Sequence, residues 1–479
     1  MTHTVSMTPT RMGGGVKAVV TIACILLLLV SLLDMNVVTA AAPSIGRYFG
    51  AAATAHIPWL VSAYALAETV AQPLYGKLTD RLGVRPILLA SIVLFGVGSV
   101  LCGFAPSMTA LIFFRLLQGL GAAGLHSTTF VLLGHLRTAT GTDDDGAGNS
   151  AGGVLLAVGI VAGPLLGGTI IAHMDWRWIF WINVPILAVI LLVLLIFLRL
   201  SIEQRTEPID WPAAGALAGA AVALQLVCVL GGQEFAWWSP QTVIIGLGGI
   251  ACVVYFGLRQ RRSRAPFFPP EVLRLRILRQ VAVLQLTAGI GLAASVYITF
   301  ELQLVRGFTP FQAGLHLIAM AAGVILGAIA GFVLIKRGRP LKASLIIGTA
   351  ASALALAALI FCGPAAPLPV VWLLLAVNGF GSGISLGNEL TIIQDSVDAR
   401  DLGIATTGIR FVETLGTSAG ATLFGLVFAH IAGTGTDAVA LAIGVIFAIA
   451  ALFLLAAALT ATRLPRRMTR TASAVPLEG

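Results

Sequence analysis

The chain has 479 residues, of which 58% are hydrophobic and only 10% are charged. Soluble domains carry about 25% charged residues, so this composition excludes a soluble globular protein and predicts an integral membrane protein. The formal net charge of +9 does not indicate a nucleic-acid partner, because the basic residues gather in the connections between apolar runs.

Runs of about 20 apolar residues predict membrane-spanning helices, and such runs follow one another along the whole chain. Six lie in the N-terminal half, two in the middle and six in the C-terminal half. We therefore expect an all-α polytopic membrane protein of 14 transmembrane helices, with two six-helix bundles and an inserted two-helix hairpin. The expected spans are 18–41, 56–75, 87–104, 108–133, 150–172, 178–199, 212–231, 240–258, 279–302, 311–334, 341–361, 367–392, 402–431 and 437–461.

The connections divide this array into four expected parts. Residues 1–200 form an N-terminal six-helix bundle, and residues 276–465 form a C-terminal one. Between them, 201–275 is a linker that carries the transmembrane hairpin at about 212–258 and a basic cytoplasmic loop. Residues 466–479 form a basic cytoplasmic tail. Most of the 29 Lys and Arg residues fall on one side of the array, so the positive-inside rule predicts cytoplasmic termini.

The first two spans contain acids where an ionised side chain costs about 2.5–3.5 kcal/mol. Asp34 lies in the first span and is either a functional acid or an interfacial carboxylate near the outer end. In the second span Tyr64, Glu68 and Gln72 are four residues apart and form a polar stripe that should face protein or water. Glu68 is either a proton-binding acid or a structural hydrogen-bonding residue.

A polar connection follows the second span, with the sequence Gly76-Lys-Leu-Thr-Asp80-Arg81-Leu-Gly83-Val-Arg85-Pro86. Its glycines permit a tight turn, and proline suits the first turn of the next helix. Asp80 can accept hydrogen bonds from the N-terminus of a neighbouring helix or pair with a nearby arginine. We interpret the stretch as a gating loop, because a loop that only sets topology would not need this order of glycines and acid.

The fourth span carries Arg115, Gln118 and His126 on one face. An arginine inside the membrane needs an anionic partner, and Asp34 and Glu68 are the acids available in this half. We expect Arg115 to pair with Asp34, since both lie at a similar depth, and we expect His126 to be a helix-packing residue.

The fifth span contains the string Gly159-Ile-Val-Ala-Gly163-Pro164-Leu-Leu-Gly167-Gly168. Small residues at this spacing let two helices approach closely, and Pro164 predicts a kink. A small-residue packing face is common in membranes, but the complete string is much rarer.

Polar residues recur in the C-terminal half. Arg410 and Glu413 lie three apart in one span, which favours a local ion pair at least as much as a substrate role. Glu301, near the end of the span 279–302, is expected at the membrane interface. A polar stripe is expected along the span 367–392, at Asn378, Ser382, Ser385 and Glu389.

Several of these stretches carry a family resemblance. The gating loop closely resembles the loop signature of the major facilitator superfamily, and residues 331–340 are a degenerate copy that lacks the acid. The string in the fifth span matches the signature of antiporters in that superfamily. Residues 33–43, 111–123 and 176–185 resemble motifs of its fourteen-span drug:proton antiporters, and the resemblance extends from about 18 to 461.

The resemblance implies a transporter, not an enzyme, that exports lipophilic, cationic drugs or related small molecules by alternating access in exchange for protons. Asp34, Glu68 and Arg115 would couple the proton. The gating-loop motif would comprise Gly76, Asp80, Arg81, Gly83 and Arg85, and the antiporter motif Gly159, Gly163, Pro164, Gly167 and Gly168. The substrate cavity would include Tyr64, Gln72, Gln118, Asn378, Glu389, Arg410 and Glu413.

Other functions stay open at this point. The cargo could be an endogenous lipid, siderophore or antibiotic, whereas a nutrient uptake carrier would share the fold but not the string in the fifth span. No HExxH, CxxC or phosphate-loop motif is present, so we expect no metal and no cofactor, with the proton gradient driving transport. The five cysteines show no paired spacing and indicate packing residues. The expected partners are a small-molecule substrate, protons and the lipid bilayer, for a monomer in the cell membrane.

Overall fold

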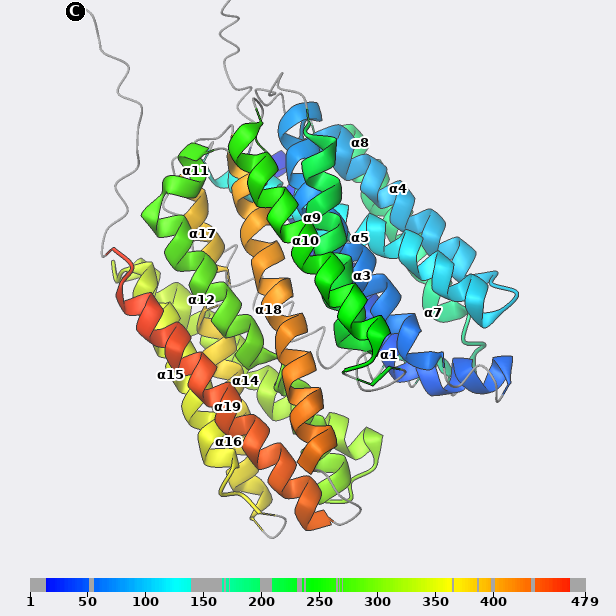
Figure 1. The fold of residues 1–479 in the computed structure, drawn as a ribbon, viewed down its shortest axis with the longest axis vertical. Helices are drawn as coiled ribbons and strands as arrows, with labels where there is room; N and C mark the ends of the chain where they lie inside the picture. Colours follow the sequence, from blue (N-terminus) through cyan, green and yellow to red (C-terminus); the bar gives the residue numbers. More distant parts are fainter. Residues whose placement is uncertain are drawn as a thin grey trace, which may run out of the picture.

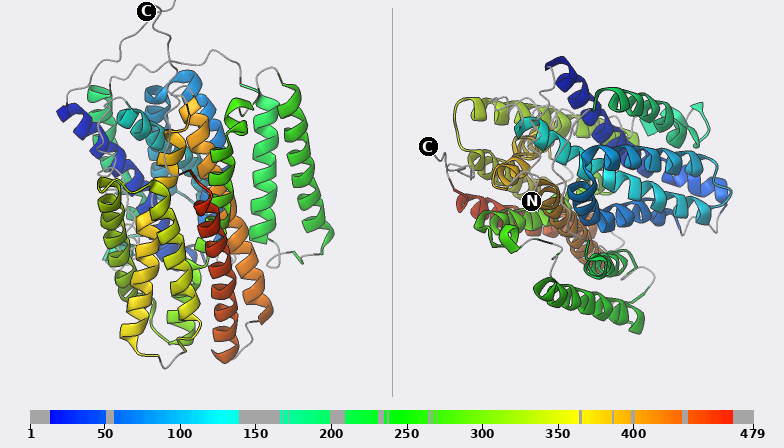
Figure 2. Two further views of the ribbon diagram at one scale, coloured as in Figure 1. Left: turned by 90° about the vertical axis from the view of Figure 1, so that its left-hand side faces the viewer. Right: turned by 90° about the horizontal axis from the view of Figure 1, so that it is seen from above.

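The computed structural model contains helices and no strand in the part of the chain that it describes, which confirms the all-α class (Figure 1). It describes residues 14–50, 56–138, 166–198, 209–230, 235–263, 266–397 and 401–465, except for 168, 172, 237, 264–265, 267, 269, 364–365, 386 and 432–435. The axes of its long helices are roughly aligned with one another (Figures 1 and 2).

The helices of the first half form one packed group. Within it α5 packs against α1, α3 and α4, while α8 packs against α1 and α4. Apolar side chains such as Leu88, Phe95 and Leu187 are buried between these helices. The bounds are α1 (Gly14–Phe49), α3 (Ile57–Leu82), α4 (Val84–Gly103), α5 (Met108–Thr138), α7 (Trp178–Trp181) and α8 (Asn183–Phe197).

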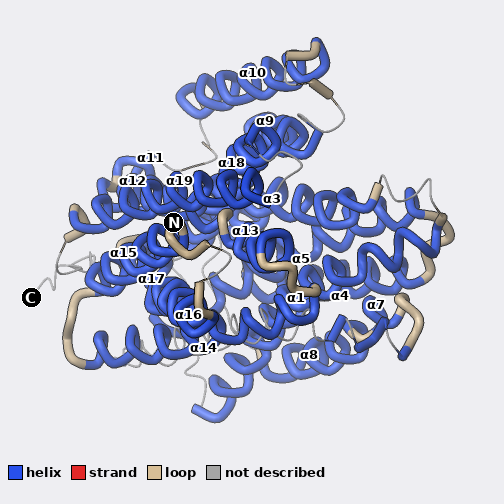
Figure 3. Tube along the Cα trace, turned by 90° about the horizontal axis from the view of Figure 1, so that it is seen from below, coloured by secondary structure: helices blue, strands red, loops and turns tan. Residues whose placement is uncertain are grey.

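The helices of the second half form another group. Here α16 packs between α14 and α15, α19 packs against α12 and α15, and α12 packs against α18. Figure 3 shows these helices on one side of the molecule and those of the first half on the other. The bounds are α11 (Pro270–Arg274), α12 (Arg276–Leu292), α13 (Ser295–Phe300), the π-helix η1 (Glu301–Val305), α14 (Pro310–Lys336), α15 (Leu341–Leu359), α16 (Leu368–Ser385), α17 (Asn388–Gln394), α18 (Leu402–Ile431) and α19 (Thr436–Thr462).

A helical pair lies beside both groups, where the inserted hairpin is expected. It consists of α9 (Trp211–Leu230) and α10 (Pro240–Arg262), which pack against each other. α9 also packs against α3 and α18, whereas α10 lies outside α9 (Figures 2 and 3). The outer face of α10 exposes Ile244, Leu247 and Ile250, as expected of a helix that faces lipid. At its end, Arg259 Nε donates to Asp210 Oδ2 at 3.1 Å and ties α10 to the start of α9.

Eleven helices in the described residues are long and apolar enough to cross a membrane. The expected span 56–75 forms α3, which is not among the eleven because it also carries charged and polar side chains. The span 212–231 is represented by a shorter apolar helix, Trp211–Val227, and most of 150–172 lies outside the described residues. The multi-pass architecture is therefore present, while the count of 14 spans and the four domain boundaries stay predictions.

The expected span 367–392 is present as Leu368–Gln394, but the polar stripe expected along it is interrupted. Gly387 between α16 and α17 has a φ of 76°, a left-handed conformation that ends a helix. Glu389 therefore does not continue the polar stripe that begins at Asn378. Glu301 lies near the end of the candidate span Arg276–Val305, where it is buried and accepts from Arg306 Nε at 2.6 Å.

Candidate functional site

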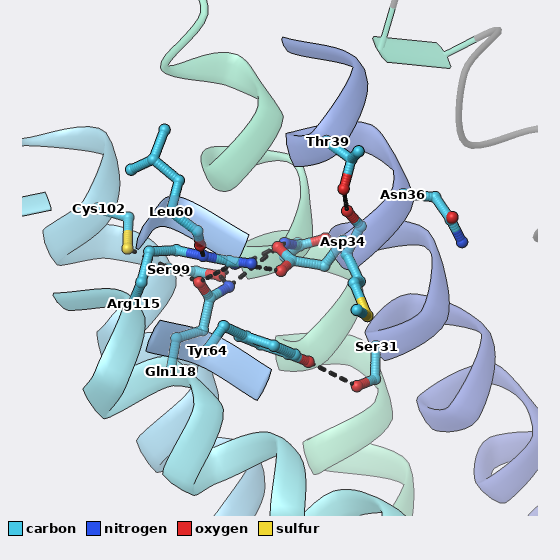
Figure 4. A network of polar contacts seen from close by, with 12 residues as sticks. Ser31, Asp34, Asn36, Thr39, Leu60, Tyr64, Ser99, Cys102, Arg115 and Gln118 are labelled. Atoms are coloured by element: carbon cyan, nitrogen blue, oxygen red, sulfur yellow. Dashed lines mark hydrogen bonds and ion pairs between the residues drawn. The ribbon is translucent and has the colours of Figure 1, made fainter. Parts of the chain in front are cut away.

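The centre of the candidate site is an ion pair between Asp34 of α1 and Arg115 of α5 (Figure 4). Arg115 Nη1 donates to Asp34 Oδ2 at 2.6 Å, and neither side chain has exposed surface. The contact expected between these residues is thus present, and the Asp34 carboxylate is enclosed by protein. Removing one partner of a buried ion pair leaves an uncompensated charge and costs about 3–5 kcal/mol.

Two amide side chains complete the surroundings of the Asp34 carboxylate. Gln118 Nε2 donates to Oδ1 at 3.0 Å, and Asn183 Nδ2 donates to the same oxygen at 2.7 Å. Gln118 Nε2 also donates to Ser99 Oγ at 2.7 Å, which links α4 to this network. Donors from α5 and α8 therefore converge on one carboxylate, an arrangement that suits its ionised form.

The guanidinium of Arg115 is held on several sides. Its Nε donates to the carbonyl oxygen of Leu60 at 3.0 Å, and Nη1 also donates to Gln118 Oε1 at 2.8 Å. The Tyr64 ring lies 4.3 Å from the guanidinium carbon, a distance at which a cation is attracted to the ring face. Tyr64 Oη in turn lies 3.0 Å from Ser31 Oγ of α1. Among the described residues, Arg115 Nη2 has no hydrogen-bond partner.

Glycines on α4 and α5 bring the helices close enough for this network to form. A side chain at Gly119 would collide with the Tyr64 carbonyl oxygen of α3, and one at Gly98 of α4 would lie 2.8 Å from the Gln118 backbone. Small residues at such crossings let neighbouring helices approach closely. Arg115 is consequently enclosed by protein instead of facing lipid.

A second charged contact joins α3 and α5. His126 Nδ1 lies 2.6 Å from Glu68 Oε1, and 21% and 15% of the respective side-chain surfaces are exposed. Gln72 Nε2 is 3.5 Å from the same carboxylate oxygen. Gln72 also receives a hydrogen bond at 3.5 Å from Thr414 Oγ1 of α18. The stripe therefore faces protein, with Tyr64 and Glu68 towards helices of their own group and Gln72 towards the other group. His126 is therefore more than a packing residue.

The C-terminal residues form a separate cluster. Arg410 Nη1 donates to Glu413 Oε2 at 2.7 Å, which is the local pair expected from their spacing. Gln285 Nε2 of α12 donates to the same oxygen at 3.2 Å, and the Arg410 guanidinium lies 4.7 Å from the Phe130 ring of α5. Glu389 is buried near this pair, at the start of α17. Asn378 is buried in α16, within the same helical group.

The stretch expected as a gating loop is helical except at Gly83, because residues 76–82 form the last turns of α3 and residues 84–86 begin α4. This end of α3 reaches the other helical group. Asp80 Oδ2 accepts from the backbone N–H of Ile404 at 3.0 Å, in the first turn of α18. This is the expected contact with the N-terminus of a neighbouring helix, where negative charge is favoured. A side chain at Gly76 would overlap Thr407 of α18, so only glycine permits this approach.

The remaining loop residues set the turn and its surroundings. Gly83 has a φ of 90°, which glycine adopts without strain, between the end of α3 and the start of α4. Arg85 Nη2 donates to the carbonyl oxygen of Leu195 at 3.0 Å, whereas Arg81 is exposed. Of the antiporter motif, Gly159, Gly163, Pro164 and Gly168 lie outside the described residues, and Gly167 is buried.

Sequence reasoning missed Asn183, Ser99 and the role of His126 as the partner of Glu68. Asn183 lies in the apolar run 178–199. A polar side chain buried without a hydrogen-bond partner costs free energy, so the argument used for Asp34 also predicts a polar partner for Asn183. Nothing in the sequence singled out Ser99. In the described part of the chain, no group of three or more His, Cys, Asp or Glu side chains could hold a metal ion.

Comparisons with known proteins agree on one family. The sequence pattern described as the Major Facilitator Superfamily matches residues 24–421. An uncharacterized MFS-type transporter of Mycobacterium tuberculosis (strain H37Rv) is 31% identical over 403 residues, which is 84% of this chain and 58% of the relative. The chain thus spans little more than half the length of that relative. Multidrug resistance protein 3 of Bacillus subtilis (strain 168) is 29% identical over 413 residues, covering 85% and 79% of the two chains.

Solved structures show the same fold. The crystal structure of the human organic anion transporter MFSD10 has a TM-score of 0.70 at 16% identity and covers 93% of this chain and 99% of that one. The proton:xylose symporter XylE, bound to 6-bromo-6-deoxy-D-glucose, has a TM-score of 0.65 at 14% identity, with coverage of 93% and 95%. At these identities the likeness concerns the fold alone.

Proposed function

The chain belongs to the major facilitator superfamily, and we propose that it is a proton-coupled antiporter that exports lipophilic, cationic drugs or related small molecules. It is a multi-pass membrane transporter and not an enzyme. The observation that carries the proposal is the Asp34–Arg115 pair, whose side chains have no exposed surface. Ionisable residues inside a membrane are costly, and they mark ion pathways and proton relays.

In the proposed cycle, Asp34 carries the coupled proton. A proton that reaches its carboxylate from outside neutralises the acid, frees Arg115 from its counter-charge and loosens the hydrogen bonds from Gln118 and Asn183. Those bonds join α1 to α5 and α8, so the change in charge alters the contacts between these three helices of the first group. Release of the proton to the inside restores the pair, and Glu68 serves as a secondary acid.

Alternating access requires the two helical groups to rock against each other. In the structure they meet through α3 and α5 on one side and α18 on the other, and Asp80 caps the first turn of α18. With the proposed cytoplasmic termini, these contacts lie on the cytoplasmic side. They support a state that is closed towards the cytoplasm, which the gating loop stabilises through Gly76, Asp80, Arg81, Gly83 and Arg85.

The choice of cargo rests on relatives and on charge. Relatives are named Multidrug resistance protein 3 and Multidrug transporter protein MdtP in Bacillus subtilis (strain 168). In the C-terminal cluster a second acid, Glu389, is buried near the Arg410–Glu413 pair, so two carboxyl groups lie where a cation would be attracted. An endogenous lipid, siderophore or antibiotic is the alternative cargo. Uptake of a nutrient is the less favoured alternative on the same fold.

The remaining features of the proposal concern the whole chain. We place it as a monomer in the cell membrane, with 14 spans, four parts divided at about 200, 275 and 465, and both termini in the cytoplasm. The proton gradient supplies the driving force, without a cofactor. Tyr64, Gln72, Gln118, Asn378, Glu389, Arg410 and Glu413 are the proposed substrate-contacting residues.

The test uses purified protein in proteoliposomes with an imposed pH gradient and a panel that includes tetraphenylphosphonium, a siderophore, a lipid and a sugar. The wild-type protein should exchange tetraphenylphosphonium for protons, and Asp34→Asn should abolish this exchange while the protein still elutes as a folded species. Asp437→Asn, at an exposed acid in the first turn of α19, is the matched control. Proton exchange at the wild-type rate in Asp34→Asn would make Glu68 the better candidate, and transport of another panel member alone would favour that cargo.

A further inference from the structure

We infer that Gln225 of α9 is a positioning residue, which holds α3 and α18 together and thereby favours the state of the transporter that is closed towards the cytoplasm. The inference rests on the alternating access and the orientation proposed above, but it depends on neither the cargo nor the proton. Gln225 is buried, and it is the only amide, hydroxyl or charged side chain in the apolar sequence of α9. A polar side chain inside a membrane is costly and therefore needs partners.

The partners of Gln225 lie on two helices of different groups. Its Nε2 donates to Ser418 Oγ of α18 at 2.8 Å and to Thr69 Oγ1 of α3 at 3.4 Å. One amide nitrogen cannot follow both helices, so a separation of α18 from α3 at this level must break at least one of the two hydrogen bonds. The two bonds therefore stabilise the arrangement in which these helices lie together.

These hydrogen bonds continue a series of contacts between α3 and α18 that begins at the proposed cytoplasmic end. Asp80 contacts the first turn of α18, and the contact of Gln72 with Thr414 follows. Gln225 joins the two helices at the next turn towards the middle of the membrane. All of these contacts must part when the cytoplasmic side opens, and Gln225 is the member of the series that the inserted helical pair supplies.

The segment that follows α10 contacts the same two helices. Lys77 Nζ of α3 donates to the Pro266 carbonyl oxygen at 3.2 Å. A Cβ at Gly408 of α18 would lie 3.0 Å from the ring of Phe268. Phe268 is held in turn by Gln260 of α10, whose Oε1 accepts from the Phe268 N–H at 3.2 Å. The inserted pair and its linker therefore cross from one group to the other at two levels.

α10 fixes the position of α9 across this seam. A Cβ at Gly249 of α10 would lie 2.8 Å from Ala223 Cβ, so the two helices are closely packed at their middle. At their cytoplasmic end Arg259 pairs with Asp210. Figure 3 shows α9 next to α18 and α3, with α10 outside it. A pair that only filled space beside the bundles would work equally well with an apolar side chain at position 225.

The key variant is accordingly Gln225→Leu, which nearly keeps the size of the side chain but cannot donate a hydrogen bond. The readout is the distance between spin labels on Phe197→Cys of α8 and Arg337→Cys after α14, measured by double electron–electron resonance. The protein is the full chain without its native cysteines, in lipid nanodiscs. The ratio of the cytoplasm-open to the cytoplasm-closed population should rise about fivefold, as the loss of one net hydrogen bond implies.

The matched control is Gln280→Leu. Gln280 of α12 also donates one hydrogen bond, to the Arg463 carbonyl oxygen at 3.3 Å, but this contact stays within the second helical group. The ratio of the two populations should therefore remain within about twofold of the wild-type ratio.

Ser418→Ala keeps the inference falsifiable if Gln225→Leu does not fold. It removes the acceptor on α18 and should shift the ratio in the same direction. The double variant should shift the ratio no further than Gln225→Leu alone, because both substitutions remove the same bond. An unchanged ratio in either single variant, or a double variant whose shift is the product of the two single shifts, overturns the inference.

The outcome is distinguishable from a failure of the proposed function, because the measurement uses neither a cargo nor a pH gradient. A wild-type protein that does not exchange tetraphenylphosphonium for protons contradicts the proposed function, and a raised ratio in Gln225→Leu still supports the inference. A wild-type protein that exchanges the two ions, with an unchanged ratio in Gln225→Leu, contradicts the inference alone.

Discussion

The carboxylate of Asp34 owes its position to donors that come from distant parts of the sequence. Arg115 and Gln118 reach it from α5, and Asn183 reaches it from the first residue of α8. A buried carboxylate is stable only if its lone pairs are satisfied, so each donor contributes to the folded state as well as to the candidate site. Asn183 gives the shorter of the two amide hydrogen bonds.

The substitution Asn183→Ala should therefore destabilise the protein by about 1.5–3 kcal/mol, the range for a hydrogen bond to a charged group. The matched control is Asn388→Ala, since Asn388 is also buried but donates to the neutral Ser344 Oγ and Ile384 oxygen. Its cost should be about 0.5–1.5 kcal/mol. Thermal unfolding in detergent measures both. If both variants lose the same amount of stability, the charge of Asp34 does not strengthen its hydrogen bond with Asn183.

At the scale of elements, α5 organises the first half because it packs against α1, α3 and α4. The glycines of α5 let these neighbouring helices approach it closely, so that lipid does not enter between them. Gly119 meets the backbone of α3 at Tyr64, and Gly121 meets α4 at Phe95, where an added Cβ would lie 2.5 Å from the Phe95 nitrogen. The closeness of the helices, and not the polarity of α5 alone, is what encloses Arg115.

A methyl group at Gly119 should separate α5 from α3 and disturb the Arg115 network. We expect Gly119→Ala to cost about 1–3 kcal/mol, as overpacking does in a close-packed interior, and to lower the exchange of tetraphenylphosphonium for protons. Gly246→Ala on α10 is the control, because no atom lies within 4 Å of its added methyl group. Unfolding temperature and the transport rate are the two measurements. If the Gly119→Ala protein unfolds at the same temperature as Gly246→Ala, then α3 can move away from the added methyl group without a loss of stability.

The two helical groups are joined, at the scale of the whole molecule, by the contacts of α3 and α5 with α18 and by α9, which packs on both groups. Gln225 of α9 donates to Ser418 Oγ of α18 at 2.8 Å and lies 3.4 Å from Thr69 Oγ1 of α3. Through α9, the α9–α10 pair therefore lies against the interface between the two helical groups and not only at the periphery. Asp80 contributes the charged contact, at the first turn of α18.

Loss of the Asp80 charge should weaken this contact between the groups. Asp80→Asn keeps the shape of the side chain but loses the attraction of a carboxylate for a helix N-terminus, worth about 0.3–1 kcal/mol and more when partly buried. We expect transport to fall about fivefold or more while expression stays within about twofold. Asp175→Asn, at an exposed acid paired with Arg177, is the control. Equal loss of transport and expression would assign Asp80 a role in folding only.

Topology offers a test that does not depend on transport. Single cysteines at Arg262 and Arg276, in a chain without the native cysteines, should react with an impermeant reagent only from the cytoplasmic side. A cysteine at the exposed Trp238, at the other end of α10, should react only from outside. Labelling of the 262–276 segment from outside would contradict the predicted orientation.

Composition and local pattern are enough to predict the membrane class, the order of the apolar helices and the need of Arg115 for an acid. These follow from local composition and from the cost of charge in hydrocarbon, which does not depend on how the helices pack. That Asp80 could accept from the N-terminus of a neighbouring helix was predictable from its charge, which is favoured there, but the identity of that helix as α18 was not.

Which polar side chains meet depends instead on how the helices pack. That Asn183 and Ser99 join Asp34, that His126 takes Glu68, and that Glu301 is buried with Arg306 depend on how each helix is rotated about its axis. A one-residue change in the phase of a helix turns a side chain by about 100°, and no local pattern specifies that phase between helices so far apart in sequence. The break at Gly387 likewise separates Glu389 from the stripe that a continuous helix would have formed, because one residue in the left-handed conformation redirects everything that follows it.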